Sequence, residues 1–174
     1  MENIVKLAKE DKDAFANLYQ QHVEIVYRFF LVRCGNKEES EELTSDTWEI
    51  VVKKLHSLRS NEIAAFRCWL FQIAKNLLKN KWRKNEIKTV SFEDFLQNRG
   101  EVSYDEEFSF DDMGALWVEV EKLSPKQKEV VKLRFASDLK NKEIAELTGQ
   151  SEKTVASNLS RALDALRQNL HEMQ

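Results

Sequence analysis

The sequence contains few of the residues that interrupt helices. Its 174 residues include one proline and four glycines, and these two residue types are the strongest interrupters of regular structure. Their scarcity predicts long helices and excludes a turn-rich sheet protein. No apolar run reaches membrane-spanning length, and the first residues, MENIVKLAKEDKDAF, have no apolar signal core. We therefore expect a cytoplasmic protein without membrane insertion.

The sequence also lacks the residue groupings that perform catalysis or hold metals. Cys34 and Cys68 stand alone, without a CxxC pair or a histidine at ligand spacing. This favours two reduced, buried thiols over a redox switch or half of a metal site. His22, His56 and His171 are scattered and suit surface or capping positions. There is no Ser/His/Asp grouping, no glycine-rich phosphate loop and no carboxylate pair at a pocket-like position, so we expect neither an enzyme nor a cofactor.

Acidic charge is concentrated in one segment of a chain whose net charge is −3. Residues 1–85 carry 15 basic and 12 acidic side chains, and residues 113–174 carry 10 and 9. Residues 86–112 carry 2 basic and 9 acidic side chains. This distribution predicts two small domains, at 1–85 and 113–174, that are joined by an acidic flexible linker at 86–112.

Apolar periodicity predicts helices throughout the first domain. In DAFANLYQQHVEIVYRFFLVRCG, apolar residues recur every three or four positions, and Gly35 and Asn36 suit the end of this helix and the cap of the next. KEESEELTSDTWEIVVKKL follows, with Trp48 partly off its apolar face. In AAFRCWLFQIAKNLLKNKWRKN, the residues expected to face inward are Phe66, Trp69, Leu70, Ile73, Ala74 and Leu77.

The C-terminal half of that third helix is basic and contains Asn76, Asn80 and Trp82 among its lysines and arginines. Phosphate contacts beside stacking and hydrogen-bonding groups suit a nucleic acid with accessible bases. A dipole-compensated helix end with a core tryptophan fits the same spacing equally well.

The second domain contains a predicted helix-turn-helix. LSPKQKEVVKLRF opens with Ser124 as N-cap and Pro125 at the first helical position. In LKNKEIAELTGQSEKTVASNLSRALDALR, Gly149 suits a left-handed turn and Ser151 a cap between two helices. A polar, exposed N-terminal end on a long helix suits the major groove, where donors and acceptors must meet base edges. We favour this interpretation over an ordinary amphipathic hairpin because turn, cap and the small Ala145 coincide.

Over nearly its whole length the sequence resembles the extracytoplasmic-function sigma factors, the smallest members of the bacterial sigma-70 family. FANLYQQHVEIVYRF, EELTSDTWEIVVKKL and WLFQIAKNLLKNKWRK resemble that family's region-two domain. LSPKQKEVVKLRF and the helix-turn-helix stretch resemble its region-four domain.

The resemblance implies an alternative sigma factor that binds core RNA polymerase and directs promoter-specific initiation. Region two, a helical bundle, would bind the clamp coiled coil of the largest subunit and would read and melt the minus-ten element. Region four would read the minus-thirty-five element and contact the flap of the second-largest subunit. An anti-sigma factor is an expected partner, and the linker is expected to thread the polymerase cleft.

Site residues follow from the resemblance, position by position. Polymerase contacts are expected from Glu42, Leu43, Asp46, Thr47 and Glu49. Minus-ten contacts are expected from the loop at 56–65 and the basic helix, with Ser60, Asn61, Asn76, Lys79, Asn80, Trp82 and Arg83. Minus-thirty-five contacts are expected from Lys153, Thr154, Ser157, Asn158 and Arg161.

Some positions depart from the family pattern. Lys140 stands where a serine usually caps the first motif helix, which leaves Asn141 as a possible substitute. Ala156 and Asn158 replace residues that are often Lys and Arg, so region four should bind its DNA weakly.

Two other classes of function compete with this interpretation. NKEIAELTGQSEKTV also resembles the C-terminal motif of LuxR-type activators, whose N-terminal half would contain strands. A helical adaptor that only binds partners would leave the basic surfaces unexplained.

Overall fold

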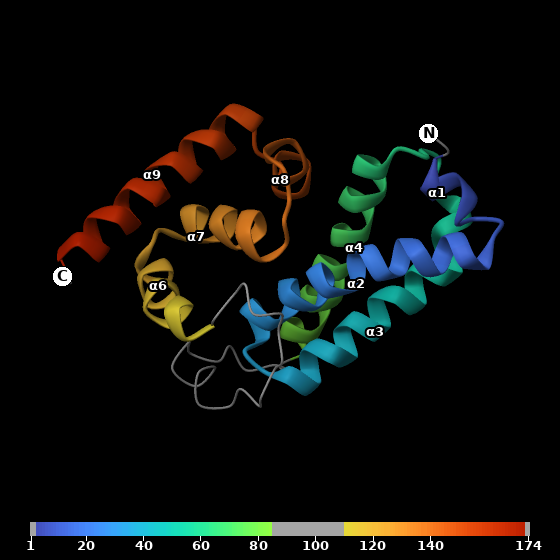
Figure 1. Ribbon diagram of the computed structural model, residues 1–174, viewed down its shortest axis with the longest axis horizontal. Helices are drawn as coiled ribbons and strands as arrows, with labels where there is room; N and C mark the ends of the chain where they lie inside the picture. The colour runs from blue at the N-terminus through green and yellow to red at the C-terminus, as the bar shows by residue number, and fades with distance from the viewer. Residues whose placement is uncertain (1–2, 85–109, 173–174) are drawn as a thin grey trace. The chain divides into compact units, whose positions relative to one another are not determined.

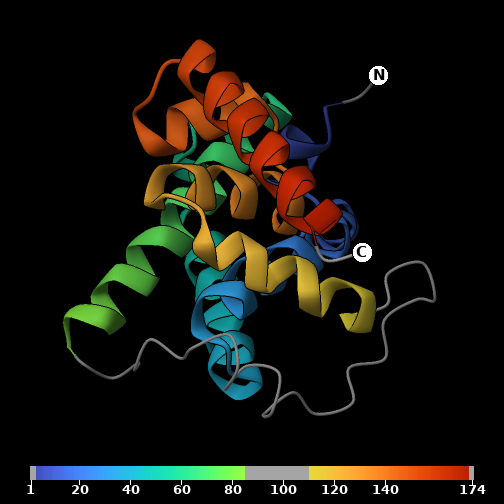
Figure 2. The same cartoon turned by 90° about the vertical axis from the view of Figure 1, so that its left-hand side faces the viewer.

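The computed structural model describes residues 3–84 and 110–172. Within these ranges the chain is helical and forms no strand, which confirms the predicted all-α class. The helices form two compact units, one made by α1 to α4 and the other by α6 to α9. Figures 1 and 2 draw the first set in blue to green and the second in yellow to red. None of the described helices combines the length and the apolar character that crossing a membrane requires. Most of the predicted linker lies outside the described residues.

The first unit contains α1 (Ile4–Leu7), α2 (Lys12–Cys34), α3 (Lys37–Lys54), the short 3-10 helix η1 (Leu55–Ser57) and α4 (Ile63–Arg83). Gly35 ends α2 with a φ of 65°, a backbone conformation that costs glycine little. Helix α3 begins at Lys37, directly after Asn36. The predicted helix boundary is therefore confirmed.

Aromatic side chains from α2 and α4 form much of the core of this unit. Phe29 contacts Phe30 and Phe71 edge-on, with ring centroids 5.3 and 5.5 Å apart. His22 is also buried, against Phe66, and its Nδ1 lies 2.8 Å from the Leu18 carbonyl oxygen. The expected surface or capping position of His22 is thus wrong, because one ring edge packs on an aromatic face while the ring nitrogen bonds its own helix.

Two other details of this core differ from the prediction. On α4 the buried residues are Phe66, Leu70, Phe71, Ala74 and Leu78, whereas Trp69, Ile73 and Leu77 are only half-buried. The inward face is therefore rotated from the predicted one. Trp48 is 5% exposed because the rings of Phe15 and Tyr19 on α2 pack edge-on against it.

The second unit contains α6 (Phe110–Lys122), α7 (Pro125–Val131), the π-helix η2 (Lys132–Ala136), α8 (Asn141–Thr148) and α9 (Glu152–Glu172). Helix α6 begins three residues before the predicted domain start at 113. The predicted cap of α7 is confirmed, because Gln127 N donates to Ser124 Oγ at 3.4 Å and Ser124 N donates to Gln127 Oε1 at 3.3 Å.

The turn between α8 and α9 has the predicted geometry. Gly149 has a φ of 70° and Ser151 Oγ accepts from Thr154 N at 3.1 Å. Ile144, Ala145 and Leu147 are buried below the turn. At the other end of α8, Asn141 does not act as the cap: Lys140 precedes the helix, and its backbone N donates to Glu143 Oε2 at 2.7 Å. The buried Glu143 carboxylate thus accepts a hydrogen bond from the backbone N–H that precedes the helix.

Candidate nucleic-acid interface

Helix α9 exposes the polar side that was predicted to enter a DNA groove. Val155, Ala162 and Leu166 are buried on its opposite side, which fixes the helix against the unit. Its five predicted contact residues all reach the surface, with Lys153, Thr154 and Arg161 exposed and Ser157 and Asn158 half-buried.

Hydrogen bonds hold the polar groups at the start of α9. Ser151 Oγ lies 2.7 Å from Thr154 Oγ1. Asn158 Nδ2 donates to Gln150 Oε1 at 3.1 Å. Lys153 and Arg161 form no ion pair within residues 3–84 and 110–172. Their charges are therefore available to an anionic partner without breaking an internal pair.

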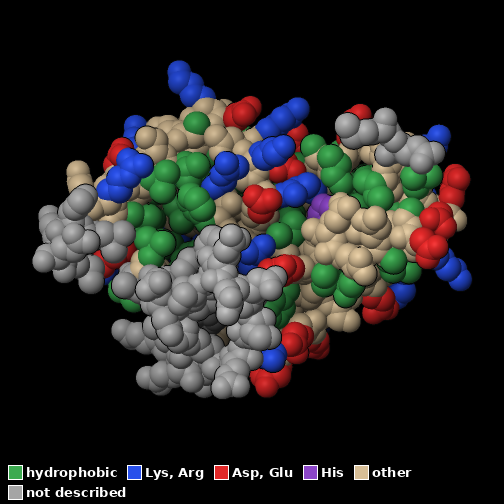
Figure 3. Space-filling model, viewed as in Figure 1, with side chains coloured by type: hydrophobic (Ala, Val, Ile, Leu, Met, Phe, Trp, Pro, Cys, Tyr) green, Lys and Arg blue, Asp and Glu red, His purple; other side chains and the backbone are tan. Residues whose placement is uncertain are grey.

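The face of the second unit seen in Figure 3 carries Lys and Arg side chains along its upper edge, above a group of hydrophobic side chains. Basic side chains gathered along one edge are typical of a surface that binds nucleic acid.

The end of α4 carries the second predicted interface. Lys79, Asn80 and Arg83 are exposed, and Trp82 is 39% exposed. The alternative in which Trp82 is a core residue is therefore wrong. Asn76, one turn earlier, is exposed and accepts from Gln72 Nε2 at 3.0 Å. The helix end thus combines cations with an amide and an aromatic ring that can meet bases.

The loop between η1 and α4 is held by contacts within and beyond itself. Ser60 Oγ accepts from Glu62 N at 3.2 Å. Lys9 Nζ donates to the Leu58 carbonyl oxygen at 2.6 Å and to Asn61 Oδ1 at 2.8 Å. Sequence reasoning missed Lys9, because nothing in the local pattern indicates contacts across 49 and 52 positions.

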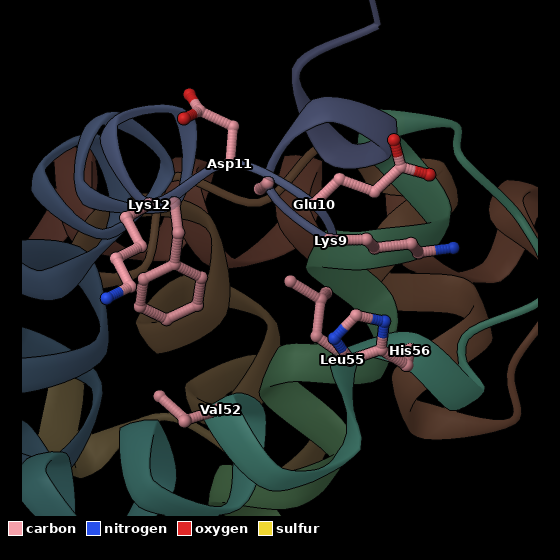
Figure 4. A pocket seen from close by; sticks show the side chains of 9 residues that line it. Lys9, Glu10, Asp11, Lys12, Val52, Leu55 and His56 are labelled. Carbon is pink, nitrogen blue, oxygen red and sulfur yellow. The ribbon is translucent and has the colours of Figure 1, made fainter.

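Beside this loop, the connection between α1 and α2 and the end of α3 enclose an open cavity of about 240 Å³ (Figure 4). Its walls include Phe15, Val52 and Leu55, and its rim carries acidic and basic side chains together with His56. Because its rim carries both acidic and basic side chains, the cavity favours neither an anionic nor a cationic ligand. In no part of residues 3–84 and 110–172 do three or more His, Cys, Asp or Glu side chains form a group that could hold a metal ion.

Helix α3 presents an acidic face. Glu42 and Glu49 are exposed and Asp46 is half-buried. Leu43 and Thr47 do not belong to this face, because both are fully buried and Thr47 Oγ1 donates to the Leu43 carbonyl oxygen at 2.7 Å. Their side chains are buried on the inner side of α3, so the accessible surface of this helix is the row of carboxylates formed by Glu42, Asp46 and Glu49.

Ion pairs orient that row. Glu42 pairs with Lys81 of α4, and Glu49 pairs with Lys53 on its own helix. Burial alone would lower the pKa of Lys81, but the hydrogen bond to Glu42 and the charges of Glu42, Asp46 and Glu39 raise it overall. The hydrogen bond from Lys53 lowers the pKa of Glu49. Glu49 therefore stays ionised at neutral pH.

Two family models match the chain, each on one of the two units. Residues 18–87 match the model for sigma-70 region 2, and residues 113–166 match that for sigma-70 region 4.

Relatives of known name extend the match over both halves. The chain is 29% identical over 169 residues to the ECF RNA polymerase sigma factor BldN of Streptomyces coelicolor, covering 95% of this chain and 64% of that relative. It is 27% identical over 165 residues to the RNA polymerase sigma factor YlaC of Bacillus subtilis, covering 91% of this chain and 93% of the relative. This chain thus spans just under two thirds of BldN and nearly all of YlaC.

A solved structure has a similar fold. It is the sigma factor RpoE of Bartonella quintana, crystallised with the anti-sigma factor NepR. The TM-score is 0.66 at 23% identity, over 92% of this chain and 98% of the other. At that identity the likeness concerns the fold alone.

Proposed function

The chain belongs to the sigma-70 family, in its extracytoplasmic-function group, and from this premise we propose that it is an alternative sigma factor that binds core RNA polymerase and directs promoter-specific initiation. The observation that carries this proposal is the order of the two family matches, region 2 on α2 to α4 and region 4 on α6 to α9. A promoter-specificity factor needs two DNA-reading surfaces on one chain, and each unit has a surface suited to one of them.

The LuxR-type alternative is not supported. It required strands in the N-terminal half, and residues 3–84 contain helices without a strand. The same half matches sigma region 2.

Helix α9 is the proposed reader of the minus-thirty-five element. Lys153 and Arg161 would supply positive charge to phosphates or to guanine edges, and Thr154, Ser157 and Asn158 would supply smaller polar groups. The helix is long, its apolar side is buried and its N-terminal end is exposed, which is the geometry of a recognition helix.

The end of α4 and the loop before it are the proposed readers of the minus-ten element. Bases read outside the stack need polar edges and aromatic surfaces, together with cations that hold the backbone. The exposed Asn76 and Asn80 offer polar edges, and Trp82 offers an aromatic surface. The cations are Lys79 and Arg83. Ser60 and Asn61 would add polar groups from the loop.

The acidic face of α3 is the proposed polymerase contact, with Glu42, Asp46 and Glu49 meeting the clamp coiled coil and Leu43 and Thr47 acting only as support. Region four would contact the flap of the second-largest subunit. We propose an anti-sigma factor as a further partner, since the solved relative was crystallised with one. These roles imply a cytoplasmic protein without catalysis.

We retain the proposed division into domains at 1–85 and 113–174 with an acidic linker between them. Nine acidic side chains in residues 86–112 suit a cleft whose walls bind phosphate. Negative charge would also make the segment yield to the growing transcript.

Co-purification with core polymerase tests the proposal against the free regulator and the adaptor. A tagged chain should retain the core subunits without DNA, and purified housekeeping sigma factor should compete for them. The triple variant Glu42→Gln, Asp46→Asn, Glu49→Gln should weaken retention, whereas Glu146→Gln on the second unit should not. A chain that binds promoter DNA but never retains core polymerase would contradict the proposal.

A further inference from the structure

Lys9 joins the start of the chain to the loop before α4. It follows α1, is half-buried, and donates to the Leu58 carbonyl oxygen at 2.6 Å and to Asn61 Oδ1 at 2.8 Å. Lys9 and Lys12 both line the open cavity beside this loop, but the side chain of Lys12 points in the direction opposite to that of Lys9 (Figure 4). One of two neighbouring lysines therefore reaches the loop.

The chemistry of this contact fixes the orientation of the Asn61 amide. The oxygen and nitrogen of an asparagine side chain usually have to be assigned from their partners. An ammonium group can only donate hydrogen bonds, so the atom that faces Lys9 must be the oxygen. The edge of Asn61 that remains for another partner carries the NH₂ donors.

We propose that Lys9 is a positioning residue for minus-ten recognition: it holds the loop through Leu58 and Asn61 and makes Asn61 present its NH₂ group to the DNA. This rests on the proposed function, in which the loop reads an unstacked base. A donor at a fixed place favours the base whose exposed edge puts an acceptor there. Charge-assisted bonds are stronger than neutral ones, so two of them hold the donor more firmly than the loop could alone.

The alternative is that Lys9 only stabilises the first unit. A purely stabilising contact would change the yield from all promoters by the same factor, whereas a positioning contact changes the ratio between bases at one minus-ten position. The ratio therefore distinguishes the two roles.

The experiment uses holoenzyme reconstituted from core polymerase and the full chain, on a promoter library in which each minus-ten position is substituted in turn. Lys9→Met keeps the side-chain stem and removes the ammonium. It should lower the ratio of preferred to disfavoured base at one position by about tenfold, the size of a single base-specific contact. Lys9→Arg can donate to both acceptors and should keep the ratio within about twofold of the original chain's. Lys12→Met is the matched control and should change nothing.

Asn61→Asp tests the amide orientation and does not depend on whether Lys9→Met folds. Aspartate still accepts from Lys9 but has no donor to offer, so the preferred base at that position should change identity. Unchanged preference in Asn61→Asp would overturn the proposal. A uniform loss across all bases in Lys9→Met, or an equal loss of ratio in Lys12→Met, would also overturn it.

The result with the unsubstituted chain distinguishes a failure of this proposal from a failure of the proposed function. If that chain supports initiation without preference at any minus-ten position, the Lys9 proposal fails together with the minus-ten role of the loop, whereas the function in core-polymerase binding and initiation stands. If it supports no initiation at all, the proposed function itself fails.

Discussion

At the scale of single residues, burial decides which polar groups can react. Cys34 is fully buried on α2, and this burial, together with the charge of Glu39, raises its pKa to about 12. Because the thiolate is the reactive form, Cys34 should be inert near neutral pH. Cys68 on α4 is only half-buried and serves as an internal reference.

Alkylation of the folded protein tests this difference. At pH 8, iodoacetamide should label Cys34 at least about a hundredfold more slowly than Cys68, and the two rates should converge in denaturant. Peptide mass spectrometry over time measures both sites in one sample. Rapid labelling of Cys34 in the native protein would contradict the prediction that this thiol is inert and would favour its role as a redox switch.

Glu119 is a second buried polar residue, and it joins two helices. It is 3% exposed on α6, and its carboxylate accepts from Lys122 Nζ at 2.5 Å and from Asn169 Nδ2 of α9 at 2.8 Å. The hydrogen bond from Lys122 is the main cause that lowers its pKa, and the bond from Asn169 also lowers it, against the effect of burial.

The lowered pKa of Glu119 determines how the stability of the second unit depends on pH. A carboxyl group with a lowered folded pKa stabilises the fold fully above its unfolded pKa, about 4.3 for glutamate, and loses that effect as pH falls through the folded pKa. Glu119→Gln should therefore unfold at a lower temperature than the original chain at pH 7, and the gap should narrow below about pH 4. Calorimetry from pH 7 to pH 3 measures the gap, and the exposed Glu146→Gln should show none. A gap that widens in acid would contradict the assigned cause.

At the scale of elements, α9 has a buried side that stabilises the unit and an exposed side that we propose binds DNA. Lys153 and Arg161 are exposed, so replacing both with alanine should change folding stability by no more than about 0.5 kcal/mol. The same change should weaken binding to minus-thirty-five duplex by roughly 1–3 kcal/mol for each residue that reads a base, and less for one that contacts only phosphate.

Fluorescence anisotropy over a salt series distinguishes these contributions. Each lost phosphate contact should reduce the slope of log K against log salt by about one. Lys126→Ala, an exposed lysine on α7, is the control for general loss of charge. Equal loss of core-polymerase binding in the α9 variant would mean that this helix side is not a DNA-reading surface.

Sequence patterns predict elements better than they predict which side of an element is covered. The helix ends at Gly35 and Ser124 and the turn at Gly149 were predictable because caps and left-handed turns depend on adjacent residues. The inward face of α4 was not, because apolar residues occur around much of that helix and its partner α2 decides which are buried. Leu43 and Thr47 were assigned to a binding surface for a different reason, because the resemblance places polymerase contacts at their positions, and in this chain both side chains are fully buried.

Contacts between distant segments left no local trace in the sequence. Lys9 and Asn61 meet only because α1 folds back beside the loop before α4. The helix start at Lys140 is different, because its partner Glu143 is only three positions away, at the place where a capping-box glutamate stands. That partner is visible in the local sequence, whereas the contact between Lys9 and Asn61 depends on tertiary packing.

At the scale of the whole molecule, a net charge of −3 is compatible with DNA recognition. The acidic surplus belongs to residues 86–112 of the sequence, whereas residues 1–85 and 113–174 each carry more basic than acidic side chains. A chain with few phosphate contacts gains little free energy from counterion release. We therefore expect core polymerase to supply most of the nonspecific DNA affinity, while this chain adds sequence preference.

A promoter library can show whether the chain confers promoter specificity on core polymerase. Transcription is measured with core polymerase alone, with core polymerase and the chain, and with housekeeping holoenzyme and the chain. We expect transcripts from a restricted promoter set only when core polymerase and the chain are combined, and no stimulation of the housekeeping holoenzyme. Stimulation of the housekeeping holoenzyme, with no transcripts from core polymerase and the chain, would contradict this expectation and identify an activator.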